Sequence, residues 1–405
     1  MADGASPPAR RTISQGRLVF LAVAGAVVTA NAYYIHPIIG LVARDFGVDG
    51  ATIGLVPALN QIALALGILL LLPLGDRISN RTLVAVTVAA QFAATLVMAL
   101  APNFAVLVVG STLLGFVTVA PYLLPAYVSK RVDAKALGRA TAWLTSGVIA
   151  GVLFARGAAG PIAEMFGWRA VYFVAAALLG VCALAMPRAM DRREAGAQGE
   201  GARDSYVALI RSLLPIVREN PDAVIAGLIQ AMNFGVFLAI WLGLGLHLTS
   251  PQLGYGADVV SYLTLLSGLN LLTTARLGKF ADKIGAGRAR VVFLVLQLLA
   301  VLLFLPVGDD LWWMVAPVVL LAFAGPVIDV TGRMTVLSSA PEIRTRLMTV
   351  YIVIMFIGAG IVSWAATAAY EVGGWHADIA LAAGLSATAL ALALWRLRAT
   401  STSKS

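Results

Sequence analysis

Apolar runs of membrane-spanning length constrain this 405-residue chain more strongly than any other feature of its sequence. A helix needs about 20 apolar residues to cross the hydrocarbon core of a bilayer. Hydrophobic residues make up 60% of the chain and charged residues 12%, whereas soluble domains average about 25% charged residues. We therefore exclude a soluble domain and predict twelve membrane-spanning helices, at 18–41, 51–73, 83–101, 104–128, 138–162, 169–187, 222–247, 257–277, 290–307, 311–337, 346–369 and 376–396.

A polar stretch at residues 188–221 divides the predicted helices into six and six. Each half carries a similar charged loop after its second helix, LLLPLGDRISNRTL at 70–83 and LGKFADKIGAGRAR at 277–290. The acidic residues of the two loops, Asp76 and Asp282, are about half a chain length apart. Position and chemistry repeat together, which indicates an internal repeat of the chain.

The repeat predicts the fold class and the division of the chain. We expect an all-α membrane protein with two pseudo-symmetric six-helix bundles. The N-terminal bundle covers 1–187, the central cytoplasmic loop covers 188–221, and the C-terminal bundle covers 222–405.

The distribution of Lys and Arg predicts the orientation of the chain. With the N-terminus in the cytoplasm, Arg44 and Arg169 fall in outer loops and Arg156 and Arg333 inside helices; the other 25 of the 29 basic residues are cytoplasmic. This asymmetry is the positive-inside pattern. It predicts a bacterial-type inner membrane protein with both termini cytoplasmic, and it accounts for the net charge of +9 without a nucleic-acid partner.

Several kinds of chemistry find no support in the sequence. The single cysteine, Cys182, permits no intrachain disulfide, and the three scattered histidines have no metal-site spacing. The chain has no phosphate-binding G-x-x-x-x-G-K-[ST] loop and no intramembrane protease motif. We therefore predict a protein that is not an enzyme and that needs no cofactor and no metal.

Several motifs resemble those of the major facilitator superfamily. The charged loop of the second half matches the superfamily pattern at Gly278, Ala281, Asp282, Lys283, Gly285 and Arg288. The stretches ANAYYIHP at 30–37, PLGDR at 73–77, LTSGVIAGVLFARGAAGP at 144–161 and GWRAVY at 167–172 resemble a narrower branch, the twelve-helix drug–proton antiporters.

The resemblance implies a secondary transporter that works by alternating access. We expect efflux of a small organic compound, coupled to protons, by a functional monomer in the bilayer. Two alternatives are open: a metabolite–proton symporter that imports its substrate, and a membrane sensor with a transporter fold that moves nothing.

The resemblance also implies a latch at the two charged loops. In the first loop the latch residues are Asp76, Arg77 and Arg81. In the second they are Asp282, Lys283 and Arg288. The alternative is that these charges only anchor the loops in the cytoplasm.

Ionisable residues inside membrane helices are costly and therefore suggest function. Asp329 and Arg333 are four residues apart, so they share one helix face and are expected to pair. Two interpretations are open for this pair, proton pick-up by Asp329 or a static ion pair. His36 is a further proton-coupling candidate, because histidine titrates near neutral pH.

Arg156 stands where the antiporter branch commonly has glycine. We consider three interpretations: an outer gate formed with Asp258, attraction of an anionic substrate, and snorkelling of the side chain to the outer headgroups.

The resemblance places polar and aromatic side chains around a central cavity. Such walls suit a moderately apolar organic molecule, although each side chain has an equally plausible packing role. The predicted cavity residues are Asn31, Tyr34, Asn60, Gln61, Tyr122, Gln230, Asn233, Trp241, Tyr351 and Met355.

Overall fold

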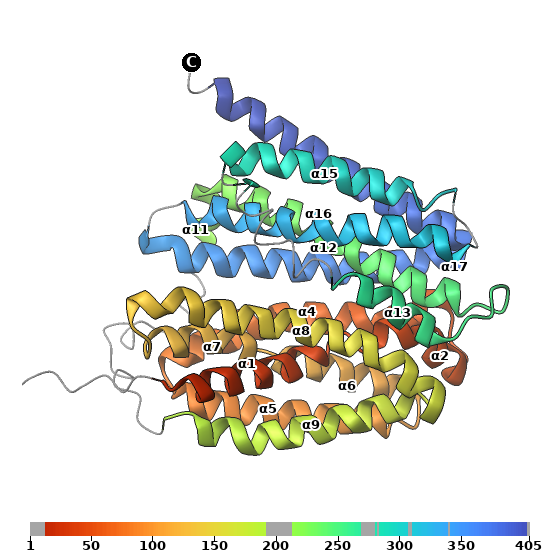
Figure 1. Ribbon diagram of the computed structural model, residues 1–405, viewed down its shortest axis with the longest axis horizontal. Helices are drawn as coiled ribbons and strands as arrows, with labels where there is room; N and C mark the ends of the chain where they lie inside the picture. The colour runs from red at the N-terminus through yellow and green to blue at the C-terminus, as the bar shows by residue number, and fades with distance from the viewer. Residues whose placement is uncertain are drawn as a thin grey trace, which may run out of the picture.

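The computed structural model describes residues 13–191, 213–268, 280–281, 283–306, 310–338 and 341–402. Every regular element in these ranges is a helix (Figure 1). The elements before the central stretch are α1 (Gln15–Ala30), α2 (Ile35–Phe46), α3 (Gly50–Ile53), α4 (Leu55–Leu71), the 3₁₀ helix η1 (Leu72–Asp76), α5 (Asn80–Ala99), α6 (Phe104–Val117), α7 (Ala120–Ser129), α8 (Ala134–Phe166) and α9 (Trp168–Ala189).

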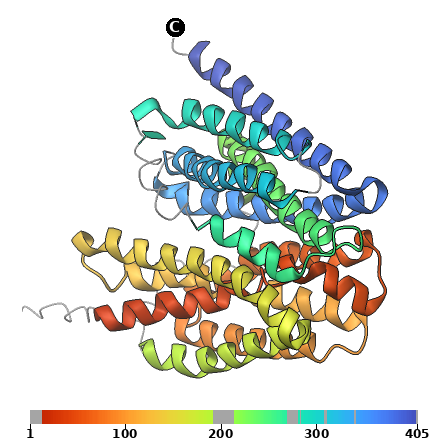
Figure 2. The same cartoon turned by 45° about the vertical axis from the view of Figure 1, so that its right-hand side comes forward.

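The elements after the central stretch are α11 (Leu213–Glu219), α12 (Pro221–Leu248), α13 (Ala257–Leu266), α15 (Ala286–Leu302), α16 (Leu311–Leu337) and α17 (Pro341–Thr402). Nine helical stretches among the described residues are long and apolar enough to cross a membrane. α17 is 62 residues long but is interrupted at Gly373 and Gly374, whose backbone angles are not helical. The chain reverses direction there, so α17 contributes two antiparallel arms (Figure 2).

Polar capping residues explain why several helices start a few residues before their apolar core. The side chains of Ser79 and Asn103 accept hydrogen bonds from Thr82 N (3.1 Å) and Val106 N (3.0 Å). Each cap satisfies an N–H group that would otherwise have no partner in the first turn. Hydropathy alone does not register a polar first turn, so the predicted start at residue 83 was three residues late. The predicted start at residue 138 was four residues late, at a helix whose N-cap residue, Asp133, forms no side-chain cap bond.

Two apolar runs that were predicted as continuous helices are interrupted. The run at 18–41 breaks at residues 31–34, between α1 and α2, and the run at 104–128 breaks between α6 and α7. A proline follows each break, Pro37 and Pro121, and proline has no N–H to donate within a helix. At the first break Asn31 Nδ2 donates instead to Val27 O (2.8 Å).

The helices form two groups that correspond to the order of the chain. α1–α9 lie together in one group and α11–α17 in the other, in both ribbon views (Figures 1 and 2). The start of α1 and the end of α17 lie at the same end of the molecule, which we call the terminal end. The opposite end, which we call the far end, holds α2, the α8–α9 turn and the interruption in α17.

The GWRAVY motif at 167–172 has a structural role at the far end. Gly167 turns the chain between α8 and α9 with φ +82°, a value that favours glycine. Trp168 Nε1 (3.0 Å) and Arg169 Nη1 (2.6 Å) both donate to Asp45 Oδ2 at the end of α2. The motif therefore ties three helices of the first group together.

Candidate functional site

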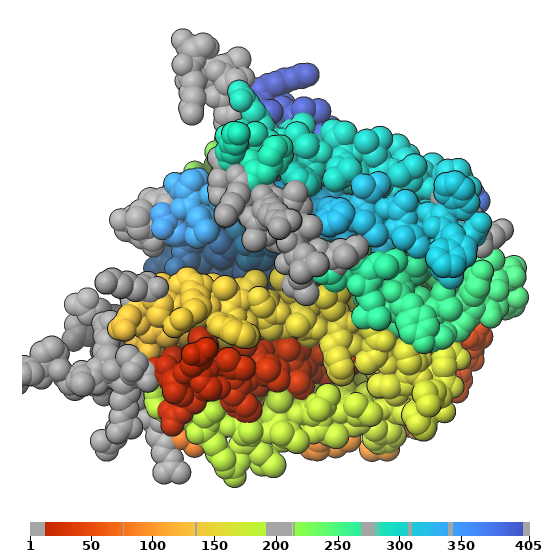
Figure 3. Space-filling view, viewed as in Figure 1, coloured from red at the N-terminus to blue at the C-terminus, as the bar shows by residue number. Residues whose placement is uncertain are grey.

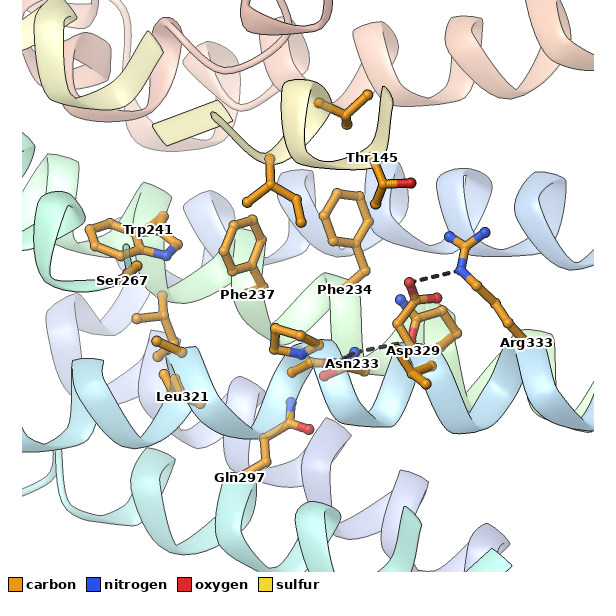
Figure 4. Close-up of a pocket in the computed structure, with 18 of the residues that line it drawn as sticks. Thr145, Asn233, Phe234, Phe237, Trp241, Ser267, Gln297, Leu321, Asp329 and Arg333 are labelled. Atoms are coloured by element: carbon orange, nitrogen blue, oxygen red, sulfur yellow. Dashed lines mark hydrogen bonds and ion pairs between the residues drawn. The ribbon is translucent and has the colours of Figure 1, made fainter. Parts of the chain in front are cut away.

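A cavity of about 580 Å³ lies between the two groups of helices (Figure 4). α7 and α8 form one side, and α12 and α16 form most of the other. Its lining is largely apolar and aromatic. The residues that line it are Pro121, Tyr122, Pro125, Leu144, Thr145, Val148, Ile149, Gln230, Asn233, Phe234, Phe237, Ile240, Trp241, Ser267, Gln297, Val318, Leu321, Ala322, Gly325, Pro326, Asp329, Val330 and Arg333.

One face of α12 supplies the aromatic wall. Phe234, Phe237 and Trp241 recur at helical spacing, and Figure 4 shows the three rings along the same face of the helix. The two phenylalanine rings stack with centroids 5.6 Å apart. Asn233 Nδ2 crosses to α16 and donates to Gly325 O (3.1 Å), which ties α12 to the helix that carries Asp329.

Asp329 forms the centre of a polar cluster in the cavity wall. Its carboxylate accepts from Arg333 Nε (2.9 Å) and from the hydroxyl of Tyr351 on α17 (2.9 Å). The predicted contact between Asp329 and Arg333 is therefore present, within one helix turn. The side chains of Asp329 and Arg333 remain 26% and 38% exposed, so water reaches the pair.

Arg156 lies deeper, between the aromatic wall and Tyr33, which stands in the break between α1 and α2. It is 1% exposed, and three rings surround its guanidinium carbon: Phe237 at 4.2 Å, Trp241 at 5.1 Å and Tyr33 at 5.4 Å. These distances are within the range of cation–π attraction, about 6 Å. Nε and Nη2 of Arg156 have no hydrogen-bond partner in the described residues.

The structure does not bring Arg156 and Asp258 together. The carboxylate of Asp258 lies beside Gly256, where the first turn of α13 begins, while Arg156 points into the rings of Tyr33, Phe237 and Trp241. The expected ion pair is therefore replaced, in this conformation, by cation–π contacts. Burial of Arg156 also leaves its charge away from the molecular surface that snorkelling requires.

The far end of the cavity is closed by direct contacts between the two groups. Gly160 of α8 lies against the carbonyl of Ala257 on α13, so a side chain at this position would collide with that backbone. Figure 3 shows the atoms of the two helices packed against each other. The hydrogen bonds that cross here are Gly160 N to Ser261 Oγ (3.0 Å), Ala257 N to Glu164 Oε1 (2.7 Å), Gly50 N to Glu371 Oε2 (2.8 Å), Ser261 Oγ to Arg156 O and Arg44 Nη1 to Thr249 O.

The opposite side of the cavity is more open. Thr145 of α8 lines the cavity and is exposed. Arg333, on the facing helix α16, also lines the cavity and is half-exposed. In Figure 4 Thr145 and Arg333 lie on the same side of the aromatic wall. The cavity therefore communicates with the surface toward the terminal end.

The predicted cavity residues divide into two sets. Tyr122, Gln230, Asn233 and Trp241 line the cavity. The others are buried outside its lining, in contacts that stabilise helix packing: Asn31 with Val27 O, Asn60 with Ser111 O (2.8 Å), Tyr351 with Asp329, and Met355 with Gln230 (3.5 Å), while Tyr34 and Gln61 are 4% and 1% exposed.

His36 is completely buried in α2 beside Tyr33, and the ring centroids are 5.5 Å apart. Neither ring nitrogen has a hydrogen-bond partner in the part of the chain that is described. His36 and Arg156 thus both lie against the ring of Tyr33, and the three residues form a buried polar group behind the cavity wall.

The described latch residues lie toward the terminal end. Asp76 ends η1, and Arg77, Lys283 and Arg288 are exposed, while Arg81 is half-buried. The side chain of Asp76 and the whole of Asp282 lie outside what the structure describes. The latch role of these loops stays a prediction.

Sequence reasoning missed two buried ionisable residues. Asp378 on the second arm of α17 is 0% exposed, and neither carboxylate oxygen has a partner among the described residues. Arg290 of α15 is 7% exposed and donates to Thr331 O (2.6 Å) and Thr335 Oγ1 (2.6 Å). Both residues stand at the edge of an apolar run, where charge counting assigned them to loops.

Membrane-length helices around a cavity that both halves of the chain line define a polytopic membrane transport protein. The chain belongs to the Major Facilitator Superfamily, whose family model matches residues 21–341. It is therefore a transporter of this type, embedded in a membrane.

Two similar proteins match nearly the whole chain. A probable transporter of Streptomyces coelicolor, SCO4007, is 30% identical over 369 residues, which cover 90% of this chain and 84% of the relative. The uncharacterized transporter YgaY of Escherichia coli O157:H7 is 25% identical over 384 residues, 95% of this chain and 96% of the relative.

Two solved structures show the same fold. A bacterial homolog of the human lysosomal transporter Spinster has a TM-score of 0.75 at 14% identity and covers 97% of this chain and 98% of its own. The POT family transporter PepTSo has a TM-score of 0.74 at 14% identity, with coverages of 96% and 99%.

Proposed function

We propose that the chain exports a small organic compound in exchange for protons, as a member of the drug–proton antiporter branch. The observation that carries this proposal is the cavity of about 580 Å³, with its aromatic wall on α12 and its single ion pair. A mostly apolar cavity with few polar groups suits an organic molecule with an apolar body.

Alternating access gives the two ends of the cavity different roles. The closed far end and the open terminal side support a state that faces the side of the membrane on which both termini lie. The neighbouring Spinster homolog was solved in an inward-facing and unoccupied conformation. With the termini cytoplasmic, as the distribution of Lys and Arg predicts, this state would load substrate from the cytoplasm.

The proposal includes twelve membrane spans in two six-helix bundles, 1–187 and 222–405, in a bacterial inner membrane. The two arms of α17 count as two spans. α13, whose run continues into residues outside the described ranges, and α15, which is 17 residues long, supply the remaining two. We propose a functional monomer, because the two halves of one chain both supply residues to the cavity lining.

Proton exchange is assigned to Asp329, with His36 as the second candidate. The carboxylate of Asp329 lines the cavity, is partly exposed to water and has Arg333 as its counter-charge. A proton that binds Asp329 would remove the charge that attracts Arg333 and weaken the hydrogen bond from the Tyr351 hydroxyl, and would thereby loosen the contact between α16 and α17.

Everted membrane vesicles test the proposal. After respiration acidifies the vesicle interior, an antiporter substrate added outside should enter in exchange for protons and dissipate the pH gradient, which a pH-sensitive dye records. Candidate compounds come from an untargeted comparison of metabolites and drug susceptibilities in cells that lack or overproduce the protein. A Gly160→Trp variant, which blocks closure of the far end, is the matched inactive control.

The same vesicles separate the alternatives. A symporter would accumulate substrate only when the gradient has the opposite sign. A sensor would bind a compound but leave its distribution unchanged. Either result would contradict proton-coupled export.

A further inference from the structure

A buried positive charge without a counter-charge lies beside the cavity. Arg156 is 1% exposed, forms no ion pair in the described residues, and leaves Nε and Nη2 without acceptors. A guanidinium taken out of water without a partner costs several kcal/mol. Such a cost suggests that a negative group joins Arg156 during the working cycle.

No carboxylate in the described residues pairs with Arg156, and the buried carboxylate of Asp378 packs against Gly243 of α12. Asp329 already pairs with Arg333, and Asp258 lies beside Gly256 at the start of α13. The stretch 269–279, which continues the run of α13 and lies outside the described residues, contains no acidic residue. The missing negative group is therefore expected to come from a bound molecule.

The aromatic rings around Arg156 argue against an organic cation as that molecule. A cation would need the faces of Phe237 and Trp241, but the guanidinium of Arg156 already lies over both rings. The charges of Arg156, Arg333 and Asp329 also sum to a net positive charge next to the cavity. A cationic ligand would therefore meet repulsion, whereas an anionic ligand would meet attraction.

Two side chains of the cavity wall contact Arg156. Phe237 and Trp241 line the cavity and, at the same time, contact the guanidinium. They belong to α12 in the second group of helices, whereas Arg156 belongs to α8 in the first. When the two groups move apart at the far end, the rings leave Arg156 and the guanidinium faces the cavity.

Tyr33 and His36 add hydrogen-bonding groups at the same place. The Tyr33 ring lies 5.4 Å from the guanidinium carbon of Arg156, and its centroid lies 5.5 Å from that of His36. Both nitrogens of His36 have no partner among the described residues. A carboxylate beside Arg156 could accept two N–H bonds from the guanidinium fork and a third from the imidazole.

We propose that the substrate is an aromatic or otherwise apolar organic anion, and that its carboxylate binds Arg156. The apolar body lies along Phe234, Phe237 and Trp241, and the carboxylate takes the place of the rings on the guanidinium as the far end opens. This inference rests on the proposed transport of a small organic compound, but it concerns binding and not the direction or coupling of transport.

Equilibrium binding to the purified protein in lipid nanodiscs tests the inference. The probes are aromatic carboxylates of increasing size, such as 3-phenylpropionate and 2-naphthylacetate, each matched with the alcohol and the amine of the same skeleton. Quenching of tryptophan fluorescence reports binding, because Trp241 lies in the cavity wall. At least one carboxylate should bind about tenfold more tightly than its alcohol and its amine, the ratio expected from one charge-assisted hydrogen bond.

Arg156→Gln should abolish this preference and leave the binding of the alcohol unchanged, while Arg156→Lys should retain part of it. Arg188→Gln, which removes an exposed guanidinium on α9, is the matched control and should bind like the wild type. Unchanged alcohol binding shows that each variant is folded.

Three results would overturn the inference: an amine that binds more tightly than its carboxylate, no carboxylate that binds, or a carboxylate preference that survives Arg156→Gln. Failure of proton-coupled export in vesicles would leave these binding results unaffected, so the two proposals fail separately.

Discussion

Asp329 accepts two hydrogen bonds, one from Arg333 on its own helix α16 and one from Tyr351 on α17. The second bond links the two helices. Asp329→Asn keeps the shape but removes the charge, so Arg333 loses its counter-charge. We expect Asp329→Asn to be destabilised by about 1 kcal/mol, the scale of a partly exposed ion pair. In thermal unfolding, the double variant Asp329→Asn/Arg333→Gln should be more stable than Asp329→Asn alone.

The same substitution tests the proton role. If Asp329 carries the proton, the transport rate of Asp329→Asn becomes independent of the pH gradient and falls below that of the wild type. Tyr351→Phe, which removes only the hydroxyl donor, should keep the dependence on the gradient. A gradient-dependent rate in Asp329→Asn equal to that of the wild type would remove Asp329 from proton coupling.

Asp378 is in contact with the backbone of α12. A Cβ atom at Gly243 would collide with the Asp378 carboxylate, which is completely buried. Gly243→Ala should therefore cost about 2 kcal/mol of stability, as overpacking typically does. The cost should be smaller when Asp378→Ala is already present, and a double-mutant cycle of unfolding midpoints measures the difference. Equal costs in both backgrounds would show that the two residues do not interact.

Residues on one helix were the easiest to relate from the sequence. The four-residue spacing of Asp329 and Arg333 sets their distance by helix geometry, so their contact could be predicted. Arg156 contacts Phe237 and Trp241, which are about 80 residues away on another helix, and no spacing rule relates them. The sequence signal that remained was the arginine in a glycine-rich run, which marked the position but not its partners.

At the scale of elements, α8 packs through its glycines on two sides. Gly147 and Gly151 lie against the backbone of α1 in the same group, and Gly157 and Gly160 lie against α13 in the other group. Small residues allow such close approach of membrane helices. The glycine-rich stretch at 144–161 thus packs α8 both against its own group and against the other group.

A bulky residue at Gly160 should keep the far end open. Ser261 is completely buried there, so Ser261→Cys in a Cys182→Ala background should react slowly with a membrane-impermeant maleimide. Gly160→Val should increase the labelling rate severalfold, because its side chain collides with Ala257 O. Met165→Cys, at a position on α8 that is 73% exposed, is the matched control. It should react at the same rate with and without Gly160→Val. An unchanged rate at Ser261→Cys would exclude a far end that opens at this contact.

The elements themselves were largely predictable because burial in lipid demands long apolar helices. The helix at 311–337 matched α16 in both bounds. The breaks at residues 31–34 and between α6 and α7 were missed, because hydropathy does not register a loss of backbone hydrogen bonds. The polar starts of the helices were missed for a related reason, since capping residues are hydrophilic.

At the scale of the whole molecule, the two groups of helices enclose a cavity that is closed at the far end and open toward the terminal end. The sequence repeat predicted two halves but could not predict this asymmetry, because the proposed alternating-access cycle requires the same residues to support both states. The closed end is identified by cross-group contacts such as Gly160 N to Ser261 Oγ, and these depend on the conformation and not only on the sequence.

Two distances between α8 and α16 test the alternating-access account most directly. In a Cys182→Ala background, spin labels at Met165 and Trp312 span the far end, and labels at Leu137 and Leu337 span the terminal end; all four positions are exposed. Pulsed electron paramagnetic resonance in nanodiscs measures each distribution with and without Gly160→Val. The account predicts that this substitution lengthens the far-end distance and shortens the terminal-end distance. Distances that stay unchanged, or that change in the same direction, would contradict it.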